Sequence, residues 1–430
     1  MPISSLPPEL LVAIAEQVDA GPWDRQDLYR FCLVSRAWEK AARLELYRRV
    51  GYRSNQSRAA QLARTIAARH DLARAVREMQ LSVGLDGSDH TTELTRILEA
   101  SSRVVNLAVA ARSEPLPVFA ALTAALLPNL KELEVQEPLA SKRELSAFST
   151  LLKACPILRS LHFDGLYFAP ETARAELQDL EEAAKHHSLL SLQLGVACTG
   201  RLPELFIPPS CTTLQRLSVE ITVSVGPSHL ESLTGLQSLE LYTGFLESAE
   251  NPNVNDASIT AKTILERCSA LPSLRSVTLN LNWEGDYYVN GNPPSSFAYE
   301  YIIDIETLHA LPPTLATLEI NDSLVNADEF LTFLDSTHRP PSLSFIKIDL
   351  FWEMFRPSKL KPVLRRLHSL GLRYEIAPFE VYFYDEDDED DLGYTCDEVK
   401  SAGPVLKWDG GDWSGPELES EVEDGLPDES

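Results

Sequence analysis

The stretch LKELEV, residues 130–135, decides the fold of most of this chain, because its apolar pattern recurs along the sequence. The pattern is L-x-x-L-x-L, with Leu, Val, Ile, Phe or Met accepted at the apolar positions. Eleven copies begin at residues 76, 104, 130, 158, 189, 214, 236, 274, 315, 343 and 367. One copy alone means little, whereas eleven at a near-constant spacing predict stacked repeats.

The spacing favours one kind of repeat. Most intervals fall in or near the period of about 20–29 residues that is typical of leucine-rich repeats, which contribute one strand per copy to a parallel sheet. In five copies a proline stops the preceding helix two positions before the first leucine (Pro128, Pro156, Pro272, Pro313 and Pro341). Amphipathic segments at 117–127 and 257–270 are predicted to be helices on the outer face. We expect an α/β fold: an irregular solenoid with a parallel sheet on its concave face.

The first fifty residues have a different pattern and are predicted to form a three-helix domain. SLPPELLVAIAEQV (5–18) and residues 27–34 are expected to be helices, and Ser35 is expected to cap a third helix that runs to Val50. The expected organisation is therefore 1–50 helical domain, 51–75 connection, 76–384 solenoid and 385–430 acidic disordered tail.

The helical domain carries more apolar surface than its size can bury. Units of about 40–50 residues are marginal alone. The physical expectation is that a partner helix covers part of this surface.

Two segments of this domain resemble the F-box. They are LPPELLVAI (6–14) and DLYRFCLVSRAWEKAA (27–42). In that family the F-box docks onto the Skp adaptor, which links it to a cullin scaffold, and C-terminal repeats hold the substrate. The resemblance implies that the adaptor-facing and internal surface is made by Leu6, Pro7, Leu10, Leu11, Ile14, Leu28, Cys32, Leu33, Val34 and Trp38.

A second interpretation of the same residues stays open. Leu10, Leu11, Ile14 and Trp38 could form the core of a small helical cap, because the terminal repeats of a solenoid need covering.

The composition narrows the function classes. A formal charge of −26 argues against a general affinity for nucleic acid or anionic membranes. Six dispersed cysteines without a C-x-x-C pair suit a reducing cytoplasmic or nuclear compartment. No apolar run reaches about 18 residues, so no membrane-spanning helix is expected.

The sequence shows no pattern of a catalytic or metal centre. P-loop, G-x-G-x-x-G, H-E-x-x-H and G-x-S-x-G motifs are absent. His186-His187 lacks ligands at metal spacing, and the acidic run 385–391 lacks the glycine of a calcium loop. We expect a non-catalytic protein without a cofactor or metal.

Candidate substrate-binding residues come from the repeat region. Side chains that alternate with the buried leucines line the sheet face, and the interval before the copy at residue 315 holds an aromatic-rich insertion. The candidates from these two sources are Glu240, Tyr242, Asn280, Trp283, Tyr287 and Tyr288. The alternatives are an ordinary solvated sheet face and a loop that packs on its own aromatic side chains.

The resemblance to the F-box, together with the repeats that follow it, implies the substrate-recognition subunit of a Skp–cullin–F-box (SCF-type) ubiquitin ligase. The alternative is a leucine-rich-repeat scaffold for protein interactions with no ligase role.

Overall fold

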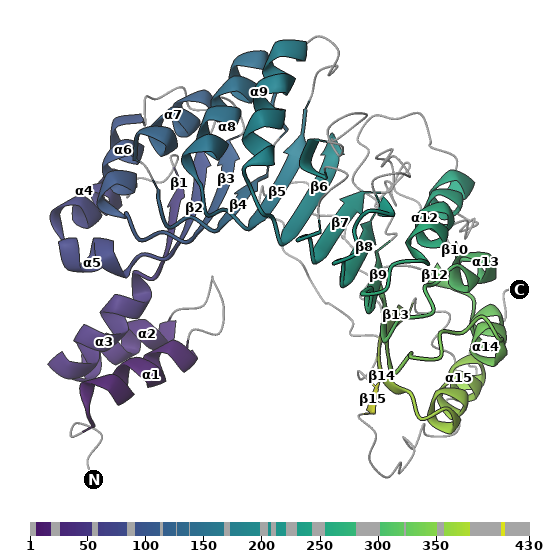
Figure 1. The fold of residues 1–430 in the computed structure, drawn as a ribbon. Coiled ribbons are helices and arrows are strands. Elements are labelled where there is room, and N and C mark those ends of the chain that lie inside the picture. The colour runs from purple at the N-terminus through teal and green to yellow at the C-terminus, as the bar shows by residue number, and fades with distance from the viewer. Residues whose placement is uncertain are drawn as a thin grey trace, which may run out of the picture. The chain divides into compact units, whose positions relative to one another are not determined.

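The structure is a computed structural model that describes most of the helical domain and of the repeats. The described residues are 6–18, 26–53, 59–83, 91–111, 115–125, 127–136, 138–166, 173–197, 205–207, 212–220, 230–242, 254–280, 302–321, 324–350, 357–378 and 406–408. The chain forms two compact units, Met1–Leu214 and Gln215–Ser430. Each is a mixed α/β assembly (Figure 1).

The first unit begins with three helices and continues as strands that alternate with helices. The opening helices are α1 (Pro8–Val18), α2 (Gln26–Val34) and α3 (Arg36–Leu46). The strands are β1 (Arg49–Arg53), β2 (Glu78–Val83), β3 (Asn106–Ala111), β4 (Glu132–Val135), β5 (Ser160–Gly165) and β6 (Ser191–Ala197). The helices between them are α4 (Ala59–Ala68), α5 (His70–Ala75), α6 (Thr91–Ala100), α7 (Pro115–Ala125), α8 (Lys142–Ala154) and α9 (Arg174–Lys185).

The second unit repeats the same arrangement. Its main strands are β7 (Arg216–Glu220), β8 (Ser238–Tyr242), β9 (Ser276–Asn280), β11 (Thr317–Asn321), β13 (Phe345–Leu350), β14 (Arg373–Pro378) and β15 (Leu406–Trp408). A short pair, β10 (Ile302–Ile303) and β12 (Leu324–Val325), lies apart from this sheet. The described helices are α12 (Val254–Cys268), α13 (Ile305–His309), α14 (Ala327–Asp335) and α15 (Pro357–Ser369).

Within each unit the repeat strands pair in parallel and in the same register. The central leucine position of the template aligns across the first unit as Met79, Leu107, Leu133, Leu161 and Leu192. In the second unit Leu217, Leu239, Val277, Leu318 and Ile346 align in the same way. All of these side chains are buried, because the helices cover that side of the strands (Figure 1). The predicted solenoid of leucine-rich repeats is therefore confirmed.

Ten of the eleven template copies give a strand that begins two residues after the first apolar residue. The strand predicted from the copy at residue 367 is wrong, because Leu367 belongs to α15. Leu360, Val363, Leu364 and Leu367 are buried at helical spacing, so the helix continues to Ser369. Gly371 then adopts φ +67°, and the next strand starts at Arg373. The last repeat is thus shifted toward the C-terminus.

The third helix is shorter than predicted. Ser35 does cap it, since its side chain accepts from the backbone N–H of Trp38, but the helix ends at Leu46 rather than Val50. Residues 49–53 form β1, in which Val50 and Tyr52 are buried and pair in parallel with β2. Buried and exposed side chains alternate over RVGYR, which is a strand pattern that does not contain the leucine template.

One segment of the expected disordered tail is structured. Leu406–Trp408 forms β15, which pairs antiparallel with β14. The four residues VLKW (405–408) include three apolar side chains and no acidic one, so a strand there does not place acidic side chains against the sheet.

A row of aromatic rings in contact joins successive repeats inside the first unit. Phe119 of α7, Phe148 of α8 and Phe163 of β5 have ring centroids 5.9 and 4.9 Å apart, and Phe206 lies 5.9 Å beyond Phe163. All four rings are buried. These contacts hold each repeat to the next, because no repeat encloses a core by itself.

Candidate protein-interaction surface

The three N-terminal helices pack around two small apolar clusters. Leu11, Trp38 and Ala41 form one, and Ala15, Leu28 and Ala42 form the other. Phe31 packs against both, and its ring lies 4.8 Å from that of Trp38. Leu11, Leu28 and Trp38 are therefore internal residues of this domain.

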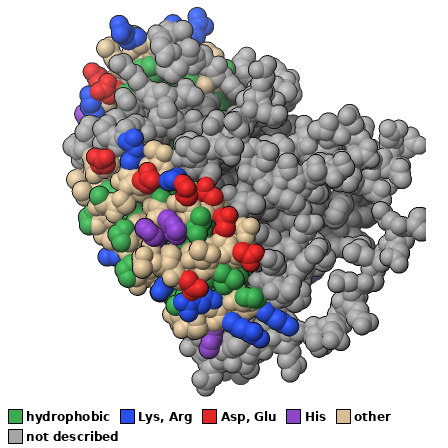
Figure 2. All heavy atoms as spheres, turned by 90° about the vertical axis from the view of Figure 1, so that its right-hand side faces the viewer, with side chains coloured by type: hydrophobic (Ala, Val, Ile, Leu, Met, Phe, Trp, Pro, Cys, Tyr) green, Lys and Arg blue, Asp and Glu red, His purple; other side chains and the backbone are tan. Residues whose placement is uncertain are grey.

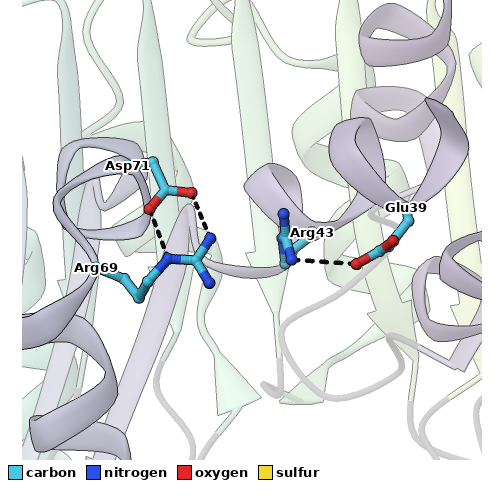
Figure 3. Close-up of polar contacts among 4 residues, drawn as sticks. All are labelled: Glu39, Arg43, Arg69 and Asp71. Carbon is cyan, nitrogen blue, oxygen red and sulfur yellow. Dashed lines mark hydrogen bonds and ion pairs between the residues drawn. The ribbon is translucent and has the colours of Figure 1, made fainter. Parts of the chain in front are cut away.

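Two solvent-accessible charged pairs lie on the elements where these helices meet the repeats. Arg43 and Glu39 pair along α3 at 3.1 Å, and Arg69 makes two hydrogen bonds with Asp71 at the start of α5 (Figure 3). The hydrogen bond from Arg69 is the main cause that lowers the pKa of Asp71 to about 2. Helices α3 and α5 lie in contact, so the helical domain is attached to the first repeats through this junction.

The structure divides the ten residues that the F-box resemblance implies for the adaptor-facing and internal surface into buried and exposed ones. Leu11, Leu28 and Trp38 are buried, Leu6 and Cys32 are partly buried against the two clusters, and the others are exposed. The exposed ones are Pro7, Leu10, Ile14, Leu33 and Val34. The five exposed side chains offer a partner the most contact area, and the three buried ones offer almost none.

The exposed apolar side chains gather in the helical domain. Six large hydrophobic side chains are exposed among the described residues: Leu10 (50%), Ile14 (37%), Tyr29 (64%), Leu33 (86%), Val34 (62%) and Ile157 (41%). All but Ile157 lie on α1 and α2. Sequence reasoning missed Tyr29, although its position one residue after buried Leu28 in a helix already places it on another face.

The strand face of the second unit holds three of the six predicted substrate-binding residues. Tyr242 and Asn280 are opposite each other on β8 and β9, and Glu240 is two residues before Tyr242 on the same face. All three are partly exposed. Trp283, Tyr287 and Tyr288 lie outside the described residues.

The strand face of the first unit holds a charged cluster around His162. Its Nδ1 lies 3.3 Å from Oε1 of Glu134, and its Nε2 lies 3.0 Å from Oδ1 of Asp164. Burial acts to lower the pKa of His162, but the hydrogen bonds from both ring nitrogens outweigh it and raise the pKa to about 9. The two carboxylates thus favour the protonated imidazole.

Gly195 leaves the space that this cluster needs. A Cβ at residue 195 would lie 2.8 Å from Oδ1 of Asp164 and 2.9 Å from its Cα. Only glycine fits beside Asp164 at this point of β6.

The described residues include no group of three or more His, Cys, Asp or Glu side chains suited to a metal ion. Burial raises the pKa of the Cys155 thiol to about 11 and that of Cys268 to about 12. Both are therefore held as unreactive thiols. None of the helices in the described part of the chain is long and apolar enough to cross a membrane.

Residues 3–53 match the F-box-like family. No curated protein matches the chain.

Among solved structures, the leucine-rich repeat-containing protein LegL7 from Legionella pneumophila is similar, with 14% identity and a TM-score of 0.40 over 77% of this chain and 90% of that one. The complex of Rad7 and Elc1 from yeast is similar with 14% identity and a TM-score of 0.32 over 81% of this chain and 94% of that one. None of these likenesses identifies a partner. The chain carries an F-box-like domain at residues 3–53, followed by a solenoid of leucine-rich repeats.

Proposed function

We propose that this protein is the substrate-recognition subunit of an SCF-type ubiquitin ligase. The F-box-like domain docks on a Skp-family adaptor, which recruits a cullin, and the repeats bind a protein substrate. The protein contributes proximity and no catalytic side chain of its own.

The observation that carries the proposal is the position of the exposed apolar side chains. Five of the six lie on α1 and α2, inside the residues that match the F-box-like family. Leu33 and Val34, at the end of α2, are among the most exposed. A cluster of exposed apolar residues is typical of a protein-interaction site.

The helical-cap alternative explains only the buried residues. A cap would use Leu11, Leu28 and Trp38 as its core and would turn its remaining apolar side chains toward the first repeat. The side chains of Leu10, Tyr29 and Leu33 stay exposed instead. Their exposure favours a partner from outside the chain.

The test is a pull-down of a Skp-family adaptor and cullin with the full chain and its variants. Leu33→Asp should lower adaptor binding at least tenfold, because it places a carboxylate in the centre of an apolar interface. Its thermal unfolding should stay unchanged, since Leu33 is 86% exposed. Ile157→Asp is the matched control: it puts the same charge on an exposed apolar residue of the repeats and should leave adaptor binding intact.

Two results would contradict the proposal. Normal adaptor capture by Leu33→Asp would mean that α2 is not the docking surface. Absence of adaptor and cullin from the wild-type complex would favour the scaffold without a ligase role.

Location follows from the same proposal. A receptor of this type works where the adaptor and cullin reside, so we propose a cytoplasmic or nuclear protein. Imaging of the tagged full chain tests this location.

A further inference from the structure

The residues that directly precede the strands of the first unit form a row, here called the edge row: Arg48, Arg77, Val105, Lys131, Arg159 and Leu190. The first five carbonyls of this row, from Arg48 to Arg159, each accept two backbone N–H groups from the next turn. Arg77 and Glu78 donate to the Arg48 carbonyl at 2.8 and 3.0 Å, and the pattern repeats up to Leu190 and Ser191. Successive members are therefore one strand apart, or about 4.8 Å.

Four of the six residues in the edge row are cations. Arg103 adds a fifth, because it lies two residues before Val105 and its turn is held to the next one by a 3.0 Å hydrogen bond from Asn129 to the Ser102 carbonyl. Burial lowers the pKa of Arg77, and the nearby charges of Arg103 and Arg48 lower it further. The positive charges of Arg103 and Arg48 thus act on Arg77, whose guanidinium donates hydrogen bonds to the carbonyls of Arg74 and Val76.

Acidic side chains nearby neutralise only part of this charge. Glu45 pairs with Arg48 at 3.4 Å, and Glu78 pairs with Arg49 at 2.9 Å. Glu132 is exposed on the strand face. Arg103, Lys131 and Arg159 are exposed and form no ion pair with the described residues. We call Arg77, Arg103, Lys131 and Arg159 the cationic edge.

The corresponding row of the second unit is nearly neutral. Its members are Gln215, Gln237, Arg275, Ala316, Ser344 and Leu372. The whole charge distribution follows the same division: residues 1–214 hold 24 Lys and Arg against 25 Asp and Glu, and residues 215–430 hold 14 against 39. On the helix side of the second unit, acidic, basic and histidine side chains intermingle (Figure 2). The cationic edge is thus a local feature of the first unit.

An exposed apolar side chain lies beside the cationic edge. Ile157, two residues before Arg159 in the turn that leads into β5, is the one exposed large hydrophobic residue outside the helical domain among the described residues. Val105 and Leu190 add partly exposed apolar groups within the edge row. The surface therefore combines positive charge with apolar contact area.

We propose that the cationic edge and Ile157 bind an extended acidic segment of a partner protein, one with an apolar side chain among its carboxylates. From Arg77 to Arg159 the row crosses three strand spacings, roughly 14 Å, which is the length of about four or five extended residues. That this acidic segment belongs to a ligase substrate rests on the proposed function. That the surface binds an acidic segment at all does not depend on that function.

Nucleic acid fits this surface less well. Proteins that bind single strands pair cationic grooves with aromatic side chains on which bases stack, and the edge row contains no aromatic residue.

The test measures binding of a fluorescein-labelled peptide of about ten residues, made of Glu and Asp with two central Leu, to the full chain by fluorescence anisotropy. Arg103→Glu with Lys131→Glu and Arg159→Glu should weaken binding by on the order of tenfold or more, and added salt should weaken binding to the wild type. Ile157→Asp should also weaken binding, whereas Ile157→Val should not.

The matched control changes the same number of charges elsewhere in the first unit. Lys142→Glu, Arg143→Glu and Arg174→Glu lie at the starts of α8 and α9, where the helix dipole tolerates acids. This variant should bind the peptide like the wild type. Thermal unfolding of both triple variants checks that each is folded.

Three outcomes would overturn the proposal. Equal loss in both triple variants would show only a dependence on net charge. Tighter binding of oligo-dT than of the peptide, lost in the first triple variant, would make the edge a nucleic-acid site. A tenfold gain in peptide affinity on deletion of residues 385–391 would show that the chain's own acidic run occupies it. Adaptor capture in the same preparations reports separately on the proposed function.

Discussion

His162 shows how the repeat frame sets the chemistry of a single residue. Its two ring nitrogens lie between Glu134 of the preceding strand and Asp164 of its own strand. Sequence alternation predicts that all three side chains share the strand face. The raised pKa needs the parallel register that aligns Glu134 with His162, and only the fold supplies that register.

The pH dependence of stability follows from this raised pKa. The pKa of His162 is about 9 in the folded chain and about 6.5 in the unfolded chain. Its stabilising contribution is therefore complete below about pH 6.5 and is lost as the pH rises through about 9. Discounted for the solvent that reaches Glu134, it is on the order of 1–3 kcal/mol.

The measurement is urea unfolding of wild type and His162→Gln from pH 6 to 10. The difference in unfolding free energy between the two proteins should be largest at the acidic end of this range and should shrink toward pH 10. Buried thiols such as Cys155 titrate in both proteins, so their effect cancels in the difference. A difference that stays constant with pH would contradict this account.

At the scale of one element, the end of α15 shows where pattern matching fails and why. Leu367 satisfies both the strand template and the helical period of Leu360 and Leu364. Gly371 decides between the two, because the backbone N–H of Leu372 donates to the Leu367 carbonyl at 3.0 Å only when residue 371 is left-handed. In the sequence, the glycine four residues after Leu367 indicates that a helix, and not a strand, ends here.

Gly371→Ala tests this helix end. A Cβ there meets nothing within 4 Å, so the cost is that of the left-handed backbone alone, about 1–2 kcal/mol. Gly371→Asn should cost less, because Asn tolerates this conformation better. Chemical denaturation of the two variants gives the comparison; equal stability of Gly371→Ala and wild type would contradict the assigned cap.

At the scale of the whole molecule, the two proposed surfaces are separate and can be lost separately. Leu33→Asp should abolish adaptor capture and keep acidic-peptide binding. Ile157→Asp should do the reverse, because Ile157 lies in the turn before β5 and Leu33 lies on α2. Both assays on both variants measure this; joint loss of the two activities in either variant would mean that the surfaces are one.

The sequence by itself determined the repeat architecture, because a buried leucine pattern at near-constant spacing is a local property that needs no partner to be read. It also determined the F-box-like start, since two ordered motif segments carry it. Only the tertiary structure decided which apolar residues of that domain are core and which are surface, because Leu10 and Leu11 are equally apolar and differ only in what packs against them. The same holds for the cationic edge: Arg77, Lys131 and Arg159 are far apart in the chain, and the hydrogen-bonded register of the strands brings them into one row.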